Sequence, residues 1–206
     1  MKKKQLNFWQ ITTIVTFIGA IVLTFIAKKN YEKFEKLRLD YITCEHNVSR
    51  FNYRFYREVS TENKVMENIK LVGVDNTIIR ICEIIKAKTL VYRFSNRSCS
   101  PCVENDIMEL KKLGSTIGYD NIIIISDYDN TRSLINLISK FSMSFKCYNY
   151  KNNIELAIDQ ESSMKEAPFF LVINRDLEIN FAHLSHEDDK INEIYFNRVK
   201  EFMLNE

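Results

Sequence analysis

The sequence predicts an α/β fold, a mixed central sheet with helices on both faces, preceded by an N-terminal transmembrane helix and a helical stalk. Short runs of β-branched and aromatic residues alternate with segments of helical period, and two such runs and a helix close the chain. An apolar, charge-free stretch near the N-terminus predicts the transmembrane helix. We therefore expect a transmembrane anchor over 1–29, a stalk over 30–66 and a globular domain over 67–206.

Composition excludes several classes of protein. Hydrophobic residues make up 46% of the 206 residues, which excludes a wholly disordered chain. The 29 basic and 27 acidic residues give a formal net charge of +2, so no overall field attracts nucleic acid and no nucleic-acid partner is expected. Five cysteines are too few to stabilise a chain of this length through structural disulfides, and their odd number leaves at least one thiol unpaired within the monomer.

The anchor is predicted from residues 8–27, an apolar segment that follows three lysines and ends at Lys28. About 20 helical residues span the hydrocarbon layer of a bilayer. Neither Ala20 nor Ala27 has a small residue two positions earlier, so an uncleaved anchor is favoured over a removed secretory signal. Basic residues lie on both sides of the span, so charge does not decide which side of the membrane the domain faces.

The stalk is predicted from residues 30–64, which contain no glycine or proline and repeat apolar residues at spacings of three, four and seven. Arg38, Glu45 and Asn52 interrupt the apolar seam. A helix that packs on its own domain is therefore favoured over a coiled-coil dimer, which stays open as an alternative. Cys44 lies in this stalk and is interpreted as a spectator.

The globular domain is expected to begin with a hairpin and to continue with alternating strands and helices. The expected elements are strands 69–74 and 77–82 around a turn at Asp75-Asn76, strand 88–95, a helix from 99 that stops at Gly114, strand 121–126, helix 131–141, strand 144–148, strand 169–174, strand 177–184 and helix 187–204. Cys82 and Cys147 fall in apolar strands, so we expect both to be small buried hydrophobes.

The chemistry is predicted from Cys99-Ser100-Pro101-Cys102, which stands between a buried strand and an amphipathic helix. Two cysteines three residues apart on a first helical turn lie on one side, close enough for a disulfide. Unpaired amide groups and the helix dipole stabilise a thiolate there, so Cys99 is expected to be the nucleophile and Cys102 the resolving thiol. Pro101 suits a first-turn position, because no hydrogen bond is lost there.

Other interpretations of the two cysteines fit less well. A zinc site needs a second pair of ligands at ligand-like spacing, and the sequence has no second pair of this kind. Two merely structural cysteines would not need a strand before them, a proline between them and an amphipathic helix after them. We therefore expect no metal and no cofactor at this motif.

With these residues in place, the chain resembles the thioredoxin superfamily, in particular the TlpA-like, membrane-anchored bacterial thiol-disulfide oxidoreductases. The resemblance covers residues 69–206 and includes Pro168, which looks like the cis-proline that faces the cysteine pair in this superfamily. It implies a thioredoxin-like domain and redox chemistry at Cys99 and Cys102, with Ala167 and Pro168 binding the substrate backbone.

The resemblance also implies partners and a location. It implies protein thiols or disulfides as substrates, a membrane protein as electron donor, and a domain on the periplasmic side of the cytoplasmic membrane. The direction of electron flow does not follow from sequence, because it depends on the relative acidities of the thiols. Two alternatives stay open: a non-enzymatic, membrane-tethered module that binds peptides or serves assembly, and a cytoplasmic redox sensor.

The sequence departs from the family pattern near the cysteines. Ser98 stands where many thioredoxins have a tryptophan, and Arg93 stands where they have a buried acid, so the usual proton acceptor is missing. Asn105 replaces a glutamate that TlpA-like relatives often carry. Either of its neighbours, Glu104 or Asp106, could assist the cysteines, but the interpretation of both as solvated first-turn carboxylates that favour the helix dipole is preferred.

Two further motifs carry weaker hypotheses. Asn96 stands where a peroxiredoxin needs a threonine, which disfavours peroxidase activity. His183 and His186 are followed by three acids and could suggest a metal site, but Ser185 as a helix N-cap with acids in the first turn explains the pattern.

Overall fold

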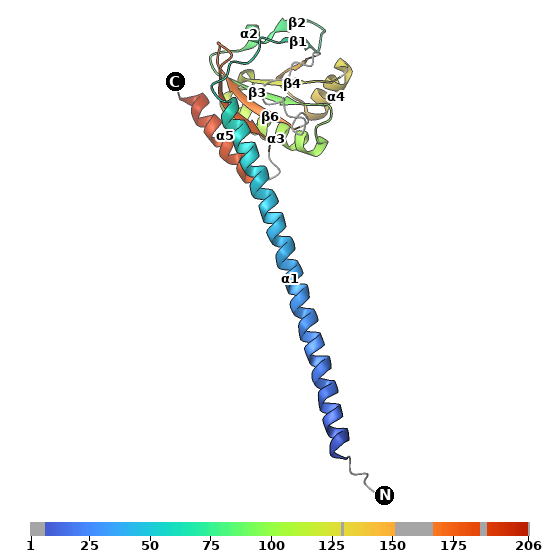
Figure 1. Ribbon diagram of the computed structural model, residues 1–206. Coiled ribbons are helices and arrows are strands. Elements are labelled where there is room, and N and C mark those ends of the chain that lie inside the picture. Colours follow the sequence, from blue (N-terminus) through green and yellow to red (C-terminus); the bar gives the residue numbers. More distant parts are fainter. Residues whose placement is uncertain (1–6, 129, 151–166, 186–188, 206) are drawn as a thin grey trace. The chain divides into compact units, whose positions relative to one another are not determined.

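The computed structural model describes residues 7–128, 130–150, 167–185 and 189–205 (Figure 1). The chain divides into two compact units, Met1–Tyr53 and Arg54–Glu206. The first unit consists of most of one helix, and the second contains the sheet.

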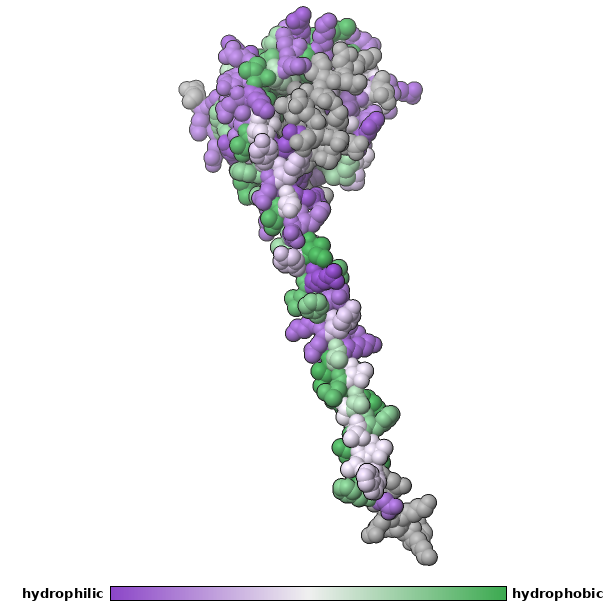
Figure 2. Space-filling view, viewed as in Figure 1, coloured by the Kyte–Doolittle hydropathy of each residue, from purple (hydrophilic) through white to green (hydrophobic). Residues whose placement is uncertain are grey.

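Helix α1 (Phe8–Thr61) is continuous over 54 residues and covers most of the ranges predicted for the anchor and the stalk. It is long and apolar enough near the N-terminus to cross a membrane, judged by length and composition. Figure 2 shows the apolar side chains gathered around the N-terminal part of this helix. The hydroxyls of Thr13 and Thr24 donate to carbonyls one turn earlier, so these polar groups are satisfied within the helix.

The second unit is built on one seven-stranded mixed sheet with the order β2-β1-β5-β4-β3-β6-β7. β4 pairs in parallel with β3 on one side and with β5 on the other. The remaining four pairs are antiparallel. The strands are β1 (Lys70–Gly73), β2 (Ile78–Arg80), β3 (Thr89–Phe94), β4 (Ile122–Ser126), β5 (Lys146–Asn149), β6 (Phe169–Ile173) and β7 (Ile179–Leu184).

The helices cover the two faces of the sheet unequally. Alternate residues of β3 point to opposite faces, so Leu90, Tyr92 and Phe94 join one buried cluster while Val91 joins another. The first cluster contains side chains of α3 (Ser100–Ile117), α4 (Thr131–Phe141) and α5 (Asp189–Leu204). The second contains the short α2 (Ile81–Ile84). Among the described residues, both faces therefore carry helix, and one face carries most of it.

The predicted hairpin is confirmed, but its second strand ends early. β1 and β2 pair antiparallel, with Leu71 opposite Ile79. The chain then turns into α2, which buries Ile81 completely. The prediction that Cys82 is a buried residue of a strand is wrong: it lies on α2 and is exposed, because a helix turn places it away from the side that Ile81 buries.

The helix after the cysteine pair does not stop at Gly114, as the sequence analysis predicted. It continues to Ile117, and Gly118 ends it with a positive φ of 89°. Position 114 is inside the helix, and a glycine suits it because the ring of Tyr119 packs against its Cα. A Cβ there would come within 2.8 Å of that ring. The glycine therefore allows a close approach of side chain to helix.

The last turns of α1 belong to the second unit and attach to β7. Glu58 Oε1 accepts a hydrogen bond from the amide of Leu184 at 2.8 Å. A guanidinium nitrogen of Arg54 donates to the carbonyl of Ser185. These contacts fix the end of β7, which contributes to the site described below.

Candidate functional site

The loop that leads from β3 into α3 is held by its own hydrogen bonds. The amide of Ser98 donates to the carbonyl of Ser95 at 2.9 Å, and its hydroxyl oxygen accepts from the amide of Ser95 at 3.0 Å. The carboxylate of Asp127, just after β4, accepts from the amide of Asn96 at 2.5 Å. Short polar side chains of this kind stabilise turns, so the loop presents the next residue, Cys99, in a fixed position.

Cys99 and Cys102 form a disulfide at the start of α3, with 5.2 Å between their Cα atoms. Cys99 is the N-cap residue, and its carbonyl accepts the first helical hydrogen bond from Val103 at 3.0 Å. Cys99 is exposed, whereas Cys102 is half-buried. Pro101 lies in the first turn, as predicted. The outer sulfur is therefore open to attack, and free amide groups of the first turn stabilise negative charge beside it.

Asp106 is buried beneath this helix, so the interpretation of it as a solvated carboxylate is wrong. Its side chain accepts two hydrogen bonds of 2.8 Å, from the hydroxyl of Tyr92 in β3 and from that of Ser185 after β7. Glu104 fits the earlier interpretation better: it is partly exposed and pairs with Lys140 at 2.6 Å. The difference arises because α3 turns residue 106, but not residue 104, toward the sheet.

Tyr92 remains a hydrogen-bond donor at any ordinary pH. Burial raises its pKa well above the usual value, and the negative charge of Asp106 raises that pKa further. The tyrosine ring also stacks on Phe170 with 4.7 Å between ring centroids. The phenol is therefore held protonated and in place against the carboxylate.

Pro168 immediately precedes β6, which pairs with the end of β3 where the cysteine loop begins, but its peptide bond differs from the expectation. No peptide bond among the described residues is cis, so the bond between Ala167 and Pro168 is trans. The trans form is the lower in free energy for most X-Pro bonds. The expectation of a cis bond was based on the resemblance alone and is wrong. Antiparallel pairing of Arg93 with Phe169 places the start of β6 next to the end of β3.

Ser185 connects this proline to the cysteine helix. Its amide donates to the carbonyl of Pro168 at 2.9 Å, and its hydroxyl donates to Asp106. The sequence pattern predicts Ser185 as the N-cap of the last helix. Residues 186–188 lie outside the described residues, and the hydroxyl of Ser185 is directed to α3.

Arg93, at the position of the missing acid, is a buried cation on the other face of the sheet. Its guanidinium lies between the rings of Tyr150 and Phe169, at 5.3 and 5.1 Å from their centroids, and donates to the hydroxyl of Tyr150 at 2.8 Å. Aromatic faces and a hydroxyl are good partners for a guanidinium. Position 93 therefore offers no proton acceptor to the cysteines.

The signal that could have found Asp106 is its helical spacing. Val103, Ile107 and Leu110 form the buried face of α3, and residue 106 falls on that face three positions after Val103. It also lies four positions, about one turn, after Cys102. A carboxylate on an apolar helix face next to a reactive cysteine is a better candidate for function than for solvation.

Among the described residues, the remaining cysteines and His183 form no second site of this kind. Cys147 is buried, as predicted, and burial raises the pKa of its thiol to about 12. His183 is buried and bonded on both ring nitrogens, to Glu58 at 2.9 Å and Asn192 at 3.0 Å. His186 lies outside the described residues, and the described part of the chain contains no cluster of three metal-binding side chains.

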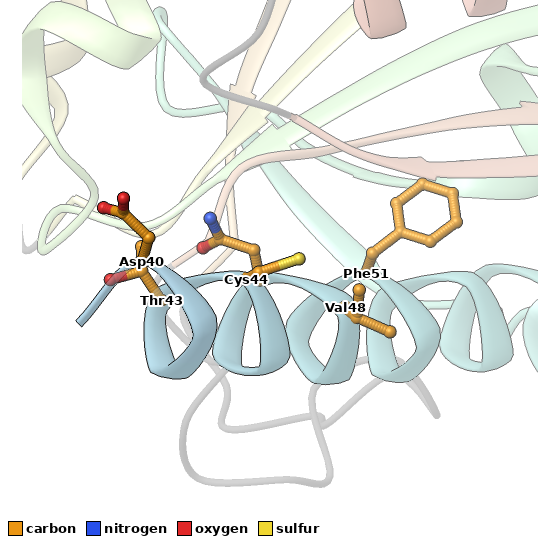
Figure 3. A pocket seen from close by; sticks show the side chains of 6 residues that line it. Asp40, Thr43, Cys44, Val48 and Phe51 are labelled. Atoms are coloured by element: carbon orange, nitrogen blue, oxygen red, sulfur yellow. The ribbon is translucent and has the colours of Figure 1, made fainter. Parts of the chain in front are cut away.

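The stalk carries a shallow hollow within the first unit. It is lined by Asp40, Thr43, Cys44, Asn47, Val48 and Phe51. Figure 3 shows the labelled side chains on successive turns of α1, with the thiol of Cys44 open to solvent. An exposed apolar strip along one helix does not by itself define a binding site.

No protein-family model matches this chain, and no curated protein matches it. Solved structures do. A thiol:disulfide interchange protein from Bacteroides sp. has a TM-score of 0.54 and 14% identity, covering 70% of this chain and 91% of that one. The thioredoxin domain of a thiol-disulfide oxidoreductase from Bacteroides vulgatus has a TM-score of 0.53 and 12% identity, covering 69% and 97%.

A third similar structure is that of a PrxQ mutant from Xylella fastidiosa, with a TM-score of 0.55 and 15% identity over 68% of this chain and 96% of that one. The predicted fold is therefore confirmed: the chain contains a thioredoxin-like α/β domain that follows a long apolar helix. At these identities the likeness establishes the fold, and the chemistry is argued below from the residues of this chain.

Proposed function

We propose that this protein is a thiol-disulfide oxidoreductase that acts on protein thiols and disulfides through Cys99 and Cys102. The observation that carries the proposal is the disulfide between these residues at the N-terminus of α3, with the first cysteine exposed and the second half-buried. Unequal exposure at a helix N-terminus suits a pair in which one thiol attacks and the other resolves. Several structures of similar fold carry names of thiol-disulfide oxidoreductases, which agrees with this chemistry.

The reaction is a two-step exchange. The thiolate of Cys99 attacks a substrate disulfide and forms a mixed disulfide, and Cys102 then attacks the sulfur of Cys99 and releases the reduced substrate. Oxidation of a substrate dithiol follows the same steps in reverse. The pair itself stores the two electrons, so the reaction requires no cofactor.

The substrate segment is proposed to lie along Ala167 and Pro168. The start of β6 is next to the end of β3, from which the cysteine loop leaves. β6 is paired on both sides, with β3 and β7, so an extended peptide would form its backbone hydrogen bonds with the segment 167–168 that precedes the strand, which would bring a substrate cysteine to Cys99. The trans bond at Pro168 changes the expected shape of the loop but not its place in the sheet.

The site of action is proposed to be the outer face of the cytoplasmic membrane. A helix long and apolar enough to span a bilayer precedes the domain, and disulfide exchange on folding proteins is a reaction of oxidising compartments. A membrane protein that supplies electrons would keep the pair reduced. A membrane-impermeant maleimide added to intact cells tests the orientation, because Cys82 is exposed on the domain and should be labelled only if the domain lies outside.

Disulfide exchange by the full-length protein in detergent tests the main proposal. Reduction of insulin by dithiothreitol should be accelerated by the wild-type protein and not by Cys99→Ser. Cys102→Ala should instead accumulate mixed disulfides that a reductant releases. Cys82→Ala, which removes an exposed thiol elsewhere in the domain, is the matched control and should retain activity.

The same variants separate the enzyme from a non-enzymatic binding module. If cells that carry Cys99→Ser behave as wild type while deletion of the whole chain has an effect, the protein acts by binding rather than by exchange. If Cys99→Ser reproduces the deletion, the sulfur chemistry is the function.

A further inference from the structure

The most unusual titratable group outside the cysteine pair is the carboxylate of Asp106. It is 2% exposed, and each of its two oxygens accepts a hydrogen bond from a hydroxyl, that of Tyr92 or that of Ser185. Burial of a carboxylate costs free energy even when it is hydrogen-bonded. Such a group in a helix otherwise packed with Val, Ile and Leu calls for a chemical role.

Its place relative to the resolving cysteine points to that role. Asp106 is four residues after Cys102 on the same regular helix, so their Cβ atoms are neighbours at about 5–6 Å. Cys102 is half-buried and must lose a proton before it can attack Cys99. A proton acceptor on the protein side of the helix would speed this step at neutral pH.

The other carboxylates of α3 do not meet this need. Glu104 pairs with Lys140 at 2.6 Å, and Glu109 pairs with Lys112 at 2.5 Å, both on the outer side of the helix. Arg93 occupies the strand position at which the resemblance to thioredoxins would place a buried acid. Within α3, Asp106 is the carboxylate that faces the interior.

We propose that Asp106 is the proton acceptor for Cys102 in the resolution step, an inference that rests on the proposed function. In the mixed disulfide, the thiol of Cys102 gives its proton to the carboxylate of Asp106. The resulting thiolate donates an electron pair to the sulfur of Cys99, and a new disulfide forms. The bond between Cys99 and the substrate sulfur breaks, and its electron pair leaves with the substrate thiolate, which takes up a proton from Asp106 or from water.

Tyr92 and Ser185 set the basicity of this acceptor. Each donates one hydrogen bond to the charged carboxylate, and such bonds favour the ionised form. Loss of either donor makes the carboxylate a stronger base that is protonated at a higher pH. Resolution should then begin to fail at a higher pH as the solution is made more acidic.

Oxidation of the reduced full-length protein by oxidised glutathione in detergent tests the proposal. Acid quenching followed by mass spectrometry of peptides measures the Cys99–glutathione adduct and the Cys99–Cys102 disulfide separately from the other cysteines. In Asp106→Asn we expect adduct formation at the wild-type rate and resolution about 100-fold slower near pH 6.5, which is the lower end of the effect of a positioned base. Glu104→Gln, an amide replacement two residues away, should resolve as wild type.

The pH dependence distinguishes proton transfer from a merely structural effect. At alkaline pH hydroxide can take the proton of Cys102 without a protein base, so the rate of Asp106→Asn should rise toward that of the wild type. A defect of the same size at every pH, or no defect at pH 6.5, overturns the proposal.

If Asp106→Asn does not fold, Tyr92→Phe and Ser185→Ala provide the test. Each keeps the carboxylate, and each should move the acid limb of the resolution profile to higher pH, whereas an unmoved limb overturns the inference. A wild-type protein that forms neither the adduct nor the disulfide would contradict the proposed function itself.

Discussion

Glu58, near the end of α1, and His183, in β7, form a hydrogen bond of 2.9 Å between the carboxylate Oε1 and the ring Nδ1. The same oxygen accepts the amide of Leu184, and the other ring nitrogen of His183 lies 3.0 Å from Asn192 Oδ1. The imidazole stacks on Tyr195 with 4.5 Å between ring centroids. Three elements of the second unit, the end of α1, β7 and α5, are thereby joined at one buried histidine.

Replacement of Glu58 by alanine should destabilise the domain. The change leaves a buried ring nitrogen and a backbone amide without their acceptor, which costs about 1–3 kcal/mol. Chemical denaturation of the full-length protein, followed by near-ultraviolet circular dichroism, measures the free energy of unfolding. Glu62→Ala is the control: Glu62 pairs with the exposed Arg198 at 3.8 Å, and its loss should cost less than about 1 kcal/mol. Equal effects of the two changes would contradict the role given to Glu58.

Replacement of Gly114 by alanine should destabilise the wild-type protein although alanine is the better helix former. The new Cβ would lie 2.8 Å from the ring of Tyr119, which must then move from its place on α3. In a Tyr119→Ser background the contact with the ring is absent and the flexible end of Ile122, at 3.3 Å, has room to move, so the same replacement should stabilise by up to about 1 kcal/mol through helix propensity. A double-mutant cycle of unfolding free energies measures this reversal of sign, and the proposed contact predicts that the sign changes.

Cys147 should make the domain less stable in alkali. Its pKa is raised to about 12 by burial, so between about pH 9 and 12 the unfolded chain has lost the thiol proton while the folded chain retains it. Unfolding is then favoured by up to about 1.4 kcal/mol for each pH unit, and the stabilisation present below pH 9 is lost. Unfolding free energies between pH 8 and 11 should fall more steeply in the wild type than in Cys147→Ala. The same slope in both proteins would show that the thiol does not titrate as described.

Arg93 should matter for stability rather than for thiol chemistry. Arg93→Lys keeps the charge but loses the planar stacking between Tyr150 and Phe169, so we expect a loss of about 1–2 kcal/mol in unfolding stability. The ratio of resolution rates at pH 6.5 and pH 9 should stay at the wild-type value. A changed ratio would place Arg93 in the proton path.

Most of the architecture could be predicted from local pattern. The helix Thr131–Phe141 has the predicted bounds, since an Asn130 cap that accepts from the amide of Ser133 begins it and a strong apolar period continues it. The strands before and after it were recognised from runs of isoleucine and aromatic residues. The cysteine pair was found because its spacing has a chemical reason that needs no tertiary information.

The errors arise where a contact outside the local pattern, or a short unexpected element, decides the structure. Gly114 is accommodated in the helix by a ring that follows the helix end, and Asp106 is satisfied by hydroxyls 14 and 79 residues away. Cys82 became exposed because Ile81 began a short helix. For Gly114 and Asp106 the deciding partner lies outside the helix that carries them, whereas for Cys82 it is the short helix that begins at the adjacent Ile81.

The division of the Asp106 site between a helix and the sheet has an evolutionary consequence. α3 carries the two sulfurs and the carboxylate, while β3 and the end of β7 carry the two hydroxyls that hold it. A small slide of this helix would alter sulfur placement and proton affinity together, whereas a change at position 92 or 185 alters the proton affinity alone. Revertants of a weakened Asp106 variant should therefore arise by compensating changes at positions 92 and 185, rather than at the cysteines.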